Sequence, residues 1–305
     1  MPTRDEIIRK ATNHISPDGK PVHGVPLDEI RINFLKMLSQ KTGRNTIAYY
    51  SGWLYTDAEL SDVNDLDMTG FMKAMKDLDG EKGLDLILHT PGGDPTAAEG
   101  IVSYLQSKFN GDIRVIVPHM AMSAGTLISC AAKSILMGKH SFLGPVDAQV
   151  GGLGLLNAIK EFEDAREDMM LHPETANYWS IRLSKYPRSF YYYAKDGIAL
   201  GDELLSKWLK NYMFAGESDN ETKKKISRIK NKLNSNNKSH GRHFSFQDCV
   251  DMGLKVEALE DDSELQDLVL SVHHAFDITL ANFPCAKIIE NQLGANYEVN
   301  VAPQQ

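Results

Sequence analysis

The chain has 305 residues, with 33 Lys and Arg against 41 Asp and Glu, which gives a formal net charge of −8 at pH 7. Its 42% hydrophobic and 24% charged residues are typical of a soluble globular protein with a substantial core. No excess of cations is available to neutralise phosphates, so the balance argues against general affinity for nucleic acid or an anionic membrane.

The cysteines and the N-terminus bear on the compartment. Cys130, Cys249 and Cys285 are far apart and have no CxxC spacing, which indicates neither a disulfide framework nor a zinc site. The N-terminal residues lack the apolar run and the small-residue cleavage site of a secretory signal. We therefore expect a cytoplasmic protein with reduced, buried thiols and without a metal or another cofactor.

The first third of the chain combines polar helices with one apolar strand. A polar N-terminal helix and a loop that contains Pro17 and Gly19 lead to a second helix at 27–40. The apolar run 46–54, which holds two tyrosines and a tryptophan, predicts the first core strand. Apolar residues at helical spacing then predict a helix over 69–78.

Strands and helices alternate from residue 84 onward. Apolar strands are predicted at 84–89, 113–117 and 135–137, with helices between them at 96–108 and 123–132. Strands of this kind, each separated by a single helix, indicate an α/β protein whose parallel sheet is covered on both faces. Ligands gather at the carboxyl ends of the strands in such sheets.

The segment 120–138 has the length of a membrane span and only one charge, Lys133. Ser123, Thr126 and Ser129 dilute its hydrophobicity, and a helix end near 131–134 precedes a new strand. We therefore predict a buried helix-to-strand unit and no membrane span.

The last half of the chain is predicted to be mainly helical. Residues 155–215 form an aromatic-rich block, which we interpret as helix packing. The basic, Asn-rich run 223–238 is typical of a solvated helix face and loop rather than a nucleic-acid site.

One serine stands where a nucleophile is expected. Residues 113–126 are predicted to form a buried strand and a tight turn that presents Ser123 at the start of a helix. The positive backbone N–H groups of a helix start help a hydroxyl to lose its proton. The small neighbours Ala121, Ala124 and Gly125 leave room for a substrate backbone.

A second turn has the same form. Residues 84–94 are predicted as a strand that ends in Pro91-Gly92-Gly93, with a helix beginning near residue 95. Both turns follow carboxyl ends of parallel strands, so we expect them to be neighbours. Gly92 and Gly93 can then direct N–H groups at a developing oxyanion, which indicates acyl transfer, above all hydrolysis.

Four motifs together resemble the serine dehydrogenase proteinase family. They are 89–94 (His-Thr-Pro-Gly-Gly-Asp), 118–126 (Pro-His-Met-Ala-Met-Ser-Ala-Gly-Thr), 143–149 (Leu-Gly-Pro-Val-Asp-Ala-Gln) and 245–254 (Ser-Phe-Gln-Asp-Cys-Val-Asp-Met-Gly-Leu). The resemblance covers roughly residues 45–260 and extends to the wider group of Clp protease proteolytic subunits, signal peptide peptidase A and crotonase-like proteins.

The resemblance implies a ClpP/crotonase-like core of repeated ββα units and a tendency to form homo-oligomers. It implies an N-terminal helical extension at 1–44, a catalytic domain at 45–260 with a helical insertion at about 155–238, and a C-terminal helical tail at 261–305. By position, Ser123 matches the nucleophile, Gly92 and Gly93 match the oxyanion-hole glycines, and Ala124 supplies a second N–H group.

The general base is less clear from the resemblance. Clp subunits have a histidine about two dozen residues after the serine, where this chain has Asp147, whereas the serine dehydrogenase proteinase pattern has a histidine that matches His240. The leading hypothesis is a Ser123–His240–Asp147 triad, since the chain order of a triad varies between folds. The Asp147 carboxylate also has a rival role, as a cap of backbone N–H groups in its turn.

Two other side chains compete for a place in the site. Signal peptide peptidase A relatives use a lysine as the base, and Lys160 is the candidate here, although the neighbouring carboxylates favour its charged form. His119 is close enough to Ser123 in sequence to line the site or to hydrogen-bond the turn.

Three functions follow from these alternatives. The first is a serine endopeptidase that hydrolyses peptides or unfolded protein segments through a Ser123 acyl-enzyme. The second is a crotonase-like enzyme that stabilises the enolate of an acyl thioester with the same N–H groups. The third is a non-catalytic oligomeric scaffold.

Overall fold

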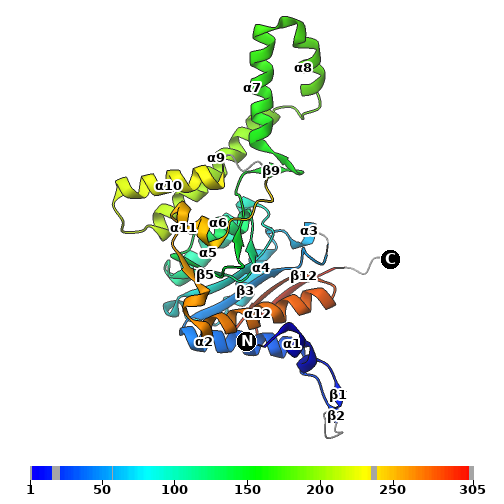
Figure 1. Cartoon of the computed structure of the whole chain (residues 1–305), viewed down its shortest axis with the longest axis vertical. Coiled ribbons are helices and arrows are strands. Elements are labelled where there is room, and N and C mark those ends of the chain that lie inside the picture. The colour runs from blue at the N-terminus through cyan, green and yellow to red at the C-terminus, as the bar shows by residue number, and fades with distance from the viewer. Residues whose placement is uncertain (1, 16–20, 57, 235–238, 302–305) are drawn as a thin grey trace.

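The computed structural model describes residues 2–15, 21–56, 58–234 and 239–301 (Figure 1). Within these ranges a central sheet has the strand order β11-β7-β5-β4-β3-β12-β13. Its first five strands are parallel, and the last two are antiparallel to their neighbours. The bounds are β3 (Asn45–Ser51), β4 (Leu84–His89), β5 (Ile113–Val117), β7 (Ser134–Met137), β11 (Val256–Ala258), β12 (Cys285–Asn291) and β13 (Asn296–Asn300).

Helices cover both faces of the sheet, as the apolar strands predict. Tyr49 points into one layer of the core and Tyr50 into the other, because successive side chains of a strand face opposite sides. The first layer packs under α4 (Asp67–Ala74), α5 (Pro95–Phe109) and α6 (Ala124–Cys130), and the second over α1 (Arg4–Ala11), α2 (Leu27–Thr42) and α12 (Ser263–Asn282). The prediction of a mixed α/β fold with a mostly parallel sheet is confirmed.

The segment 120–138 is a buried helix-to-strand unit, as predicted. It forms β6 (Met120–Ala121), α6 and β7, and β6 pairs with β8 (Phe142–Leu143) in a small separate sheet. Across the described ranges, no helix combines the length with the apolar character that a bilayer crossing requires.

The C-terminal segment differs from its prediction as a helical tail. After α12 the chain returns as β12 and β13, and β12 lies beside β3 in the sheet. The sequence does not have the pattern of a buried strand here, because Lys287 and Glu290 are charged. They are buried in ion pairs, Lys287 with Asp67 (2.7 Å) and Glu290 with Arg31 (2.8 Å). The segment thus contributes to the same sheet as the predicted catalytic domain.

An arm of helices projects from the sheet layers (Figure 1). It contains α7 (Leu155–Leu171), α8 (Ala176–Leu183) and the first part of α9 (Phe190–Trp208), and α7 packs on α9 through a small apolar cluster that includes Leu155 and Phe190. The interpretation of its aromatic residues as helix packing is right for Phe190 and Trp208, but Tyr192 and Tyr193 are exposed.

The basic run forms an amphipathic helix. Ile226, Ile229 and Leu233 of α10 (Asp219–Leu233) are buried, while its lysines face outward, so the prediction of a solvated helix face is confirmed there. Residues 235–238 of that run, like Pro17 and Gly19 of the N-terminal loop, lie outside the described residues. The remaining short strands and α-helices are β1 (His14–Ile15), β2 (Pro21–Val22), α3 (Ala58–Ser61), β9 (Gln149–Val150), β10 (Leu153–Gly154) and α11 (Phe246–Met252).

Candidate active site

Ser123 lies directly before α6, at the end of the turn that follows β5. Its backbone has φ 48° and ψ −114°, a conformation that side chains rarely adopt and that costs about 1–3 kcal/mol. The buried Thr126 hydroxyl holds the turn: its one proton lies within reach of the carbonyl oxygens of Ala121 (2.8 Å) and Gly144 (3.0 Å), and its oxygen accepts from the Gly144 N–H (2.9 Å). Such local strain at a half-buried serine that lines a cavity is typical of a positioned nucleophile.

The glycine turn lies against this serine. Gly92 has φ +100°, and a Cβ at that position would lie 2.6 Å from the Cβ of Ser123. Gly93 has φ +148°, and its Cβ would lie 2.4 Å from the backbone of Val63. Only glycine therefore lets the turn pass between Val63 and Ser123, and the predicted proximity of the two turns is present in the structure.

Backbone hydrogen bonds join the two turns. The Thr90 N–H donates to the Met120 carbonyl oxygen (3.1 Å), and the Met122 N–H donates to the Thr90 carbonyl oxygen (3.0 Å). On the other side, the Val63 N–H donates to the Gly92 carbonyl oxygen (2.7 Å). Val63 comes from the loop between α3 and α4, and no sequence signal pointed to it.

The N–H groups of the two turns differ in their availability. The Gly92 N–H donates to the Thr90 hydroxyl (3.2 Å). For the N–H groups of Gly93 and Ala124, the described part of the chain contains no hydrogen-bond partner, and both residues line the same cavity. The N–H groups that can bind an oxyanion are therefore those of Gly93 and Ala124, while Gly92 lets its turn lie close to Ser123.

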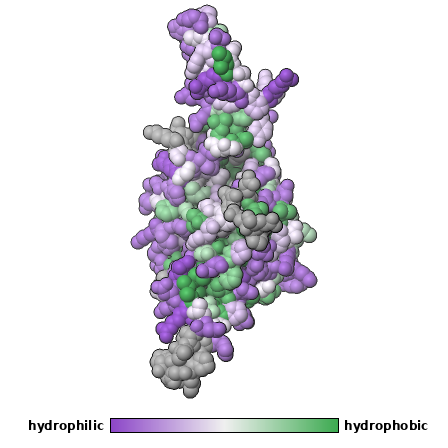
Figure 2. All heavy atoms as spheres, turned by 90° about the vertical axis from the view of Figure 1, so that its right-hand side faces the viewer, coloured by the Kyte–Doolittle hydropathy of each residue, from purple (hydrophilic) through white to green (hydrophobic). Residues whose placement is uncertain are grey.

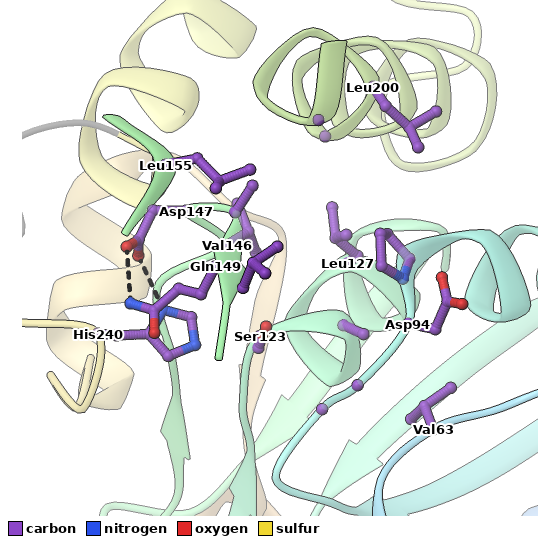
Figure 3. Close-up of a pocket in the computed structure, with 18 of the residues that line it drawn as sticks. Val63, Asp94, Ser123, Leu127, Val146, Asp147, Gln149, Leu155, Leu200 and His240 are labelled. Carbon is purple, nitrogen blue, oxygen red and sulfur yellow. Dashed lines mark hydrogen bonds and ion pairs between the residues drawn. The ribbon is translucent and has the colours of Figure 1, made fainter. Parts of the chain in front are cut away.

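The structure brings His240 and Asp147 together. His240 Nδ1 lies 3.1 Å from Asp147 Oδ1, although 93 residues separate them in the chain. The antiparallel bridge between Leu143 and Phe244 joins the segment of His240 to that of Asp147. Figure 3 shows this pair on one side of Ser123 and Leu127 on the other.

A cavity of about 960 Å³ is lined by the candidate site residues, which are Gly92, Gly93, Ser123, Ala124, Asp147 and His240. Its apolar wall includes Leu127, Val146, Leu155 and Leu200, which come from α6, the segment after β8, α7 and α9 (Figure 3). A concave apolar site with a few convergent polar groups is the usual form of a ligand pocket.

The competing side chains lie elsewhere. Lys160 is exposed on α7 and is not part of the cavity lining. His119 also lies outside the lining, and its ring stacks on that of His89 on the other side of the two turns. Sequence reasoning also missed Thr90 and Thr126, whose place inside the two turn motifs is the only signal that could have singled them out.

Comparison with known proteins finds a related family over part of the chain. The sequence model of the ClpP-like SDH-type serine proteinase family matches residues 56–172, the stretch that holds both turns and Asp147. Over that stretch, the chain is similar to ClpP-like SDH-type serine proteinases. The resemblance inferred from the motifs is thereby confirmed over residues 56–172, which hold the first three of the four motifs.

Two curated relatives come from Methanocaldococcus jannaschii. The uncharacterized protein MJ0137 is 41% identical over 102 residues, which is 33% of this chain and 35% of the relative. The uncharacterized protein MJ1495 is 41% identical over 85 residues, or 28% of this chain and 29% of the relative. The chain thus spans about a third of the length of the curated relatives it matches.

Proposed function

We propose that this chain is a serine endopeptidase that acts on peptides or unfolded protein segments. The observation that carries the proposal is the shared cavity. It is lined by a strained serine, by two N–H groups that have no partner among the described residues, and by the His240–Asp147 pair. The match of residues 56–172 to a proteinase family supports it.

In this mechanism Ser123 Oγ attacks the carbonyl carbon of the peptide, and His240 Nε2 takes the hydroxyl proton. Because Nδ1 faces the Asp147 carboxylate, that carboxylate favours the tautomer that leaves Nε2 free to accept. The N–H groups of Gly93 and Ala124 stabilise the oxyanion of the tetrahedral intermediate. The protonated imidazole then gives its proton to the leaving amine.

Deacylation repeats these steps with water. His240 takes a proton from the water as its oxygen attacks the ester carbon, and the proton returns to Ser123 Oγ as the carboxylic acid leaves. The apolar wall of the cavity supports binding of an apolar side chain next to the scissile bond.

The proposal extends to the finer fold, the assembly and the location. The separate β6–β8 pair beside the main sheet supports a ClpP/crotonase-like ββα core.

Met170, Leu171 and Ile181 expose 77%, 68% and 61% of their surface on the arm, which supports a homo-oligomer. Figure 2 shows a mostly hydrophilic face interrupted by apolar patches. The three cysteines are free and buried, which supports the cytoplasm.

The crotonase-like alternative has less support. Acyl carriers such as coenzyme A bring several phosphates, which proteins usually hold with cations. The lining of the cavity, as far as the described residues form it, contains Asp62, Asp94 and Asp196 but no Lys or Arg. The acidic lining therefore favours a peptide over an anionic thioester.

A fluorophosphonate probe tests the peptidase directly, because it reacts with an activated serine. We expect the wild type and Lys160→Ala to be labelled at equal rates, Ser123→Ala not at all, and His240→Ala at least about 10³-fold more slowly. Folding of each variant is checked by circular dichroism. A folded wild type whose Ser123 does not react would refute the peptidase, and loss of labelling in Lys160→Ala alone would replace the triad by a dyad.

A further inference from the structure

Three histidine rings form a cluster behind the two active-site turns. The ring centroids of His89, His119 and His273 are 5.4, 5.5 and 5.7 Å apart in pairs. His89 ends β4, His119 follows β5, and His273 lies on α12. The cluster therefore joins the strands that lead into both turns to a helix on the other face of the sheet.

The cluster is packed rather than arranged as a metal site. His89 is only 4% exposed and lies against the rings of Trp53 (4.4 Å) and Tyr50 (5.4 Å). The rings of His89 and His119 stack, with an angle of 16° between their planes. In the part of the chain that is described, no group of three or more His, Cys, Asp or Glu side chains is placed to hold a metal ion.

Other ionisable groups face the cluster from several elements. From α12 come Asp277 and His274, and from the segments after β7 and before α11 come His140 and His243. The Tyr50 hydroxyl lies 3.4 Å from His273 Nδ1. The Asp277 carboxylate binds Arg4 (3.2 Å) and the Tyr55 hydroxyl. Burial lowers the pKa of His273 by more than this carboxylate raises it.

His89 also bonds to the turn that carries the nucleophile. The Met120 N–H donates to His89 Nδ1 over 3.4 Å, and Met120 precedes Ser123 by three residues. His89 in turn precedes Thr90, whose backbone and hydroxyl hold Met120, Met122 and Gly92. One imidazole thus lies at the junction of both turns.

This bond requires a neutral ring. A neutral imidazole has one accepting nitrogen, whereas an imidazolium donates from both. Burial, together with His273 and His119, holds the pKa of His89 well below its ordinary value, and burial lowers the pKa of His273 to about 3. A proton on His89 Nδ1 would point at the Met120 N–H and would place a charge among two further imidazoles.

We propose that His89 is a positioning residue, whose neutral ring holds the Ser123 turn against the Gly93 turn and whose protonation releases it. The inference rests on the peptidase proposal for its effect on catalysis. Its structural part, the link between His89 and Met120, stands without that proposal.

Two variants separate the hydrogen bond from the titration. In His89→Asn the amide oxygen can accept from the Met120 N–H without titrating, while His89→Leu fills the space without an acceptor. His172→Asn is the matched control, because His172 is exposed on the arm. We measure fluorophosphonate labelling of Ser123 at pH 8, and hydrogen exchange of the Met120 amide by NMR from pH 8 down to the acid limit of the fold.

At pH 8 we expect Ser123 to be labelled at the wild-type rate in His89→Asn and in His172→Asn. In His89→Leu we expect labelling to be at least tenfold slower and hydrogen exchange of the Met120 amide to be tenfold faster. In acid, the Met120 amide should lose protection in the wild type but not in His89→Asn. Equal Met120 exchange in all variants, or an Asn variant as impaired as Leu, overturns the proposal.

Two features keep this test decisive. If His89→Leu does not fold, the wild type alone gives the test. Protection of the Met120 amide must then fall over the same pH interval in which NMR shows His89 gaining its proton. Protection that does not change as His89 gains its proton refutes the link. If Ser123 never reacts, the peptidase fails while the exchange data still decide the role of His89.

Discussion

Gly92→Ala tests the contact between the two turns most directly. The new methyl group would lie 2.6 Å from Ser123 Cβ, 2.7 Å from the Met122 carbonyl oxygen and 2.9 Å from the Ala124 nitrogen. Two of these three atoms belong to the backbone and cannot rotate away. The substitution therefore moves the turn that carries the nucleophile.

The cost has two parts. A non-glycine residue in the left-handed region loses about 1–2 kcal/mol, and overlap with packed atoms adds about 1–3 kcal/mol, so Gly92→Ala should lower the free energy of unfolding by about 2–5 kcal/mol. Gly43→Ala is the matched control, because Gly43 has φ +70° but nothing within 4 Å of its added Cβ. In Gly43→Ala the free energy of unfolding should fall only by the backbone cost of about 1–2 kcal/mol.

Activity should separate the two variants further. A displacement of about 1 Å at a reacting group costs about 10²-fold in rate, so fluorophosphonate labelling of Gly92→Ala should be about 100-fold slower, with Gly43→Ala unchanged. Urea unfolding gives the free energies of unfolding, and labelling reactions quenched at successive times give the rates of Ser123 labelling. Equal stability losses in the two variants, together with normal labelling of Gly92→Ala, would show that the turns are not in contact.

Three further predictions address the charges. Asp147→Asn should slow Ser123 labelling by about 10²–10⁴-fold, because an amide no longer favours the reactive His240 tautomer; unchanged labelling would assign the carboxylate to the turn alone. Asp85→Asn should cost about 3–5 kcal/mol in urea unfolding, since the buried Asp85 carboxylate pairs with Arg44 and Arg114, and a loss below 1 kcal/mol would contradict this. Stability should fall as the pH drops below about 6.5, because the unfolded chain then binds protons that buried His273 accepts only near its pKa of about 3. Each such histidine contributes a slope of about 1.4 kcal/mol per pH unit, so His273→Asn should flatten the curve by that amount, and an unchanged slope would contradict the prediction.

The strands and helices around the site could be predicted because their signals are local. The apolar runs at 84–89 and 113–117 became β4 and β5, and the small-residue turns after them carry Gly93 and Ser123. The rule that ligands gather at the carboxyl ends of parallel strands then predicted that the turns meet. The sequence did not predict β12, because Lys287 and Glu290 are polar and their charges are neutralised only by residues that are distant in the chain.

The sequence by itself determined the class of fold and the identity of the candidate nucleophile, since periodicity, turn residues and motif spacing act within a few residues of each other. The tertiary structure alone decided which N–H groups lack a partner among the described residues, that His240 contacts Asp147 while Lys160 is exposed, and that three histidine rings lie together. These features depend on contacts between residues tens to hundreds of positions apart. Chain packing sets such contacts, and no local pattern encodes them.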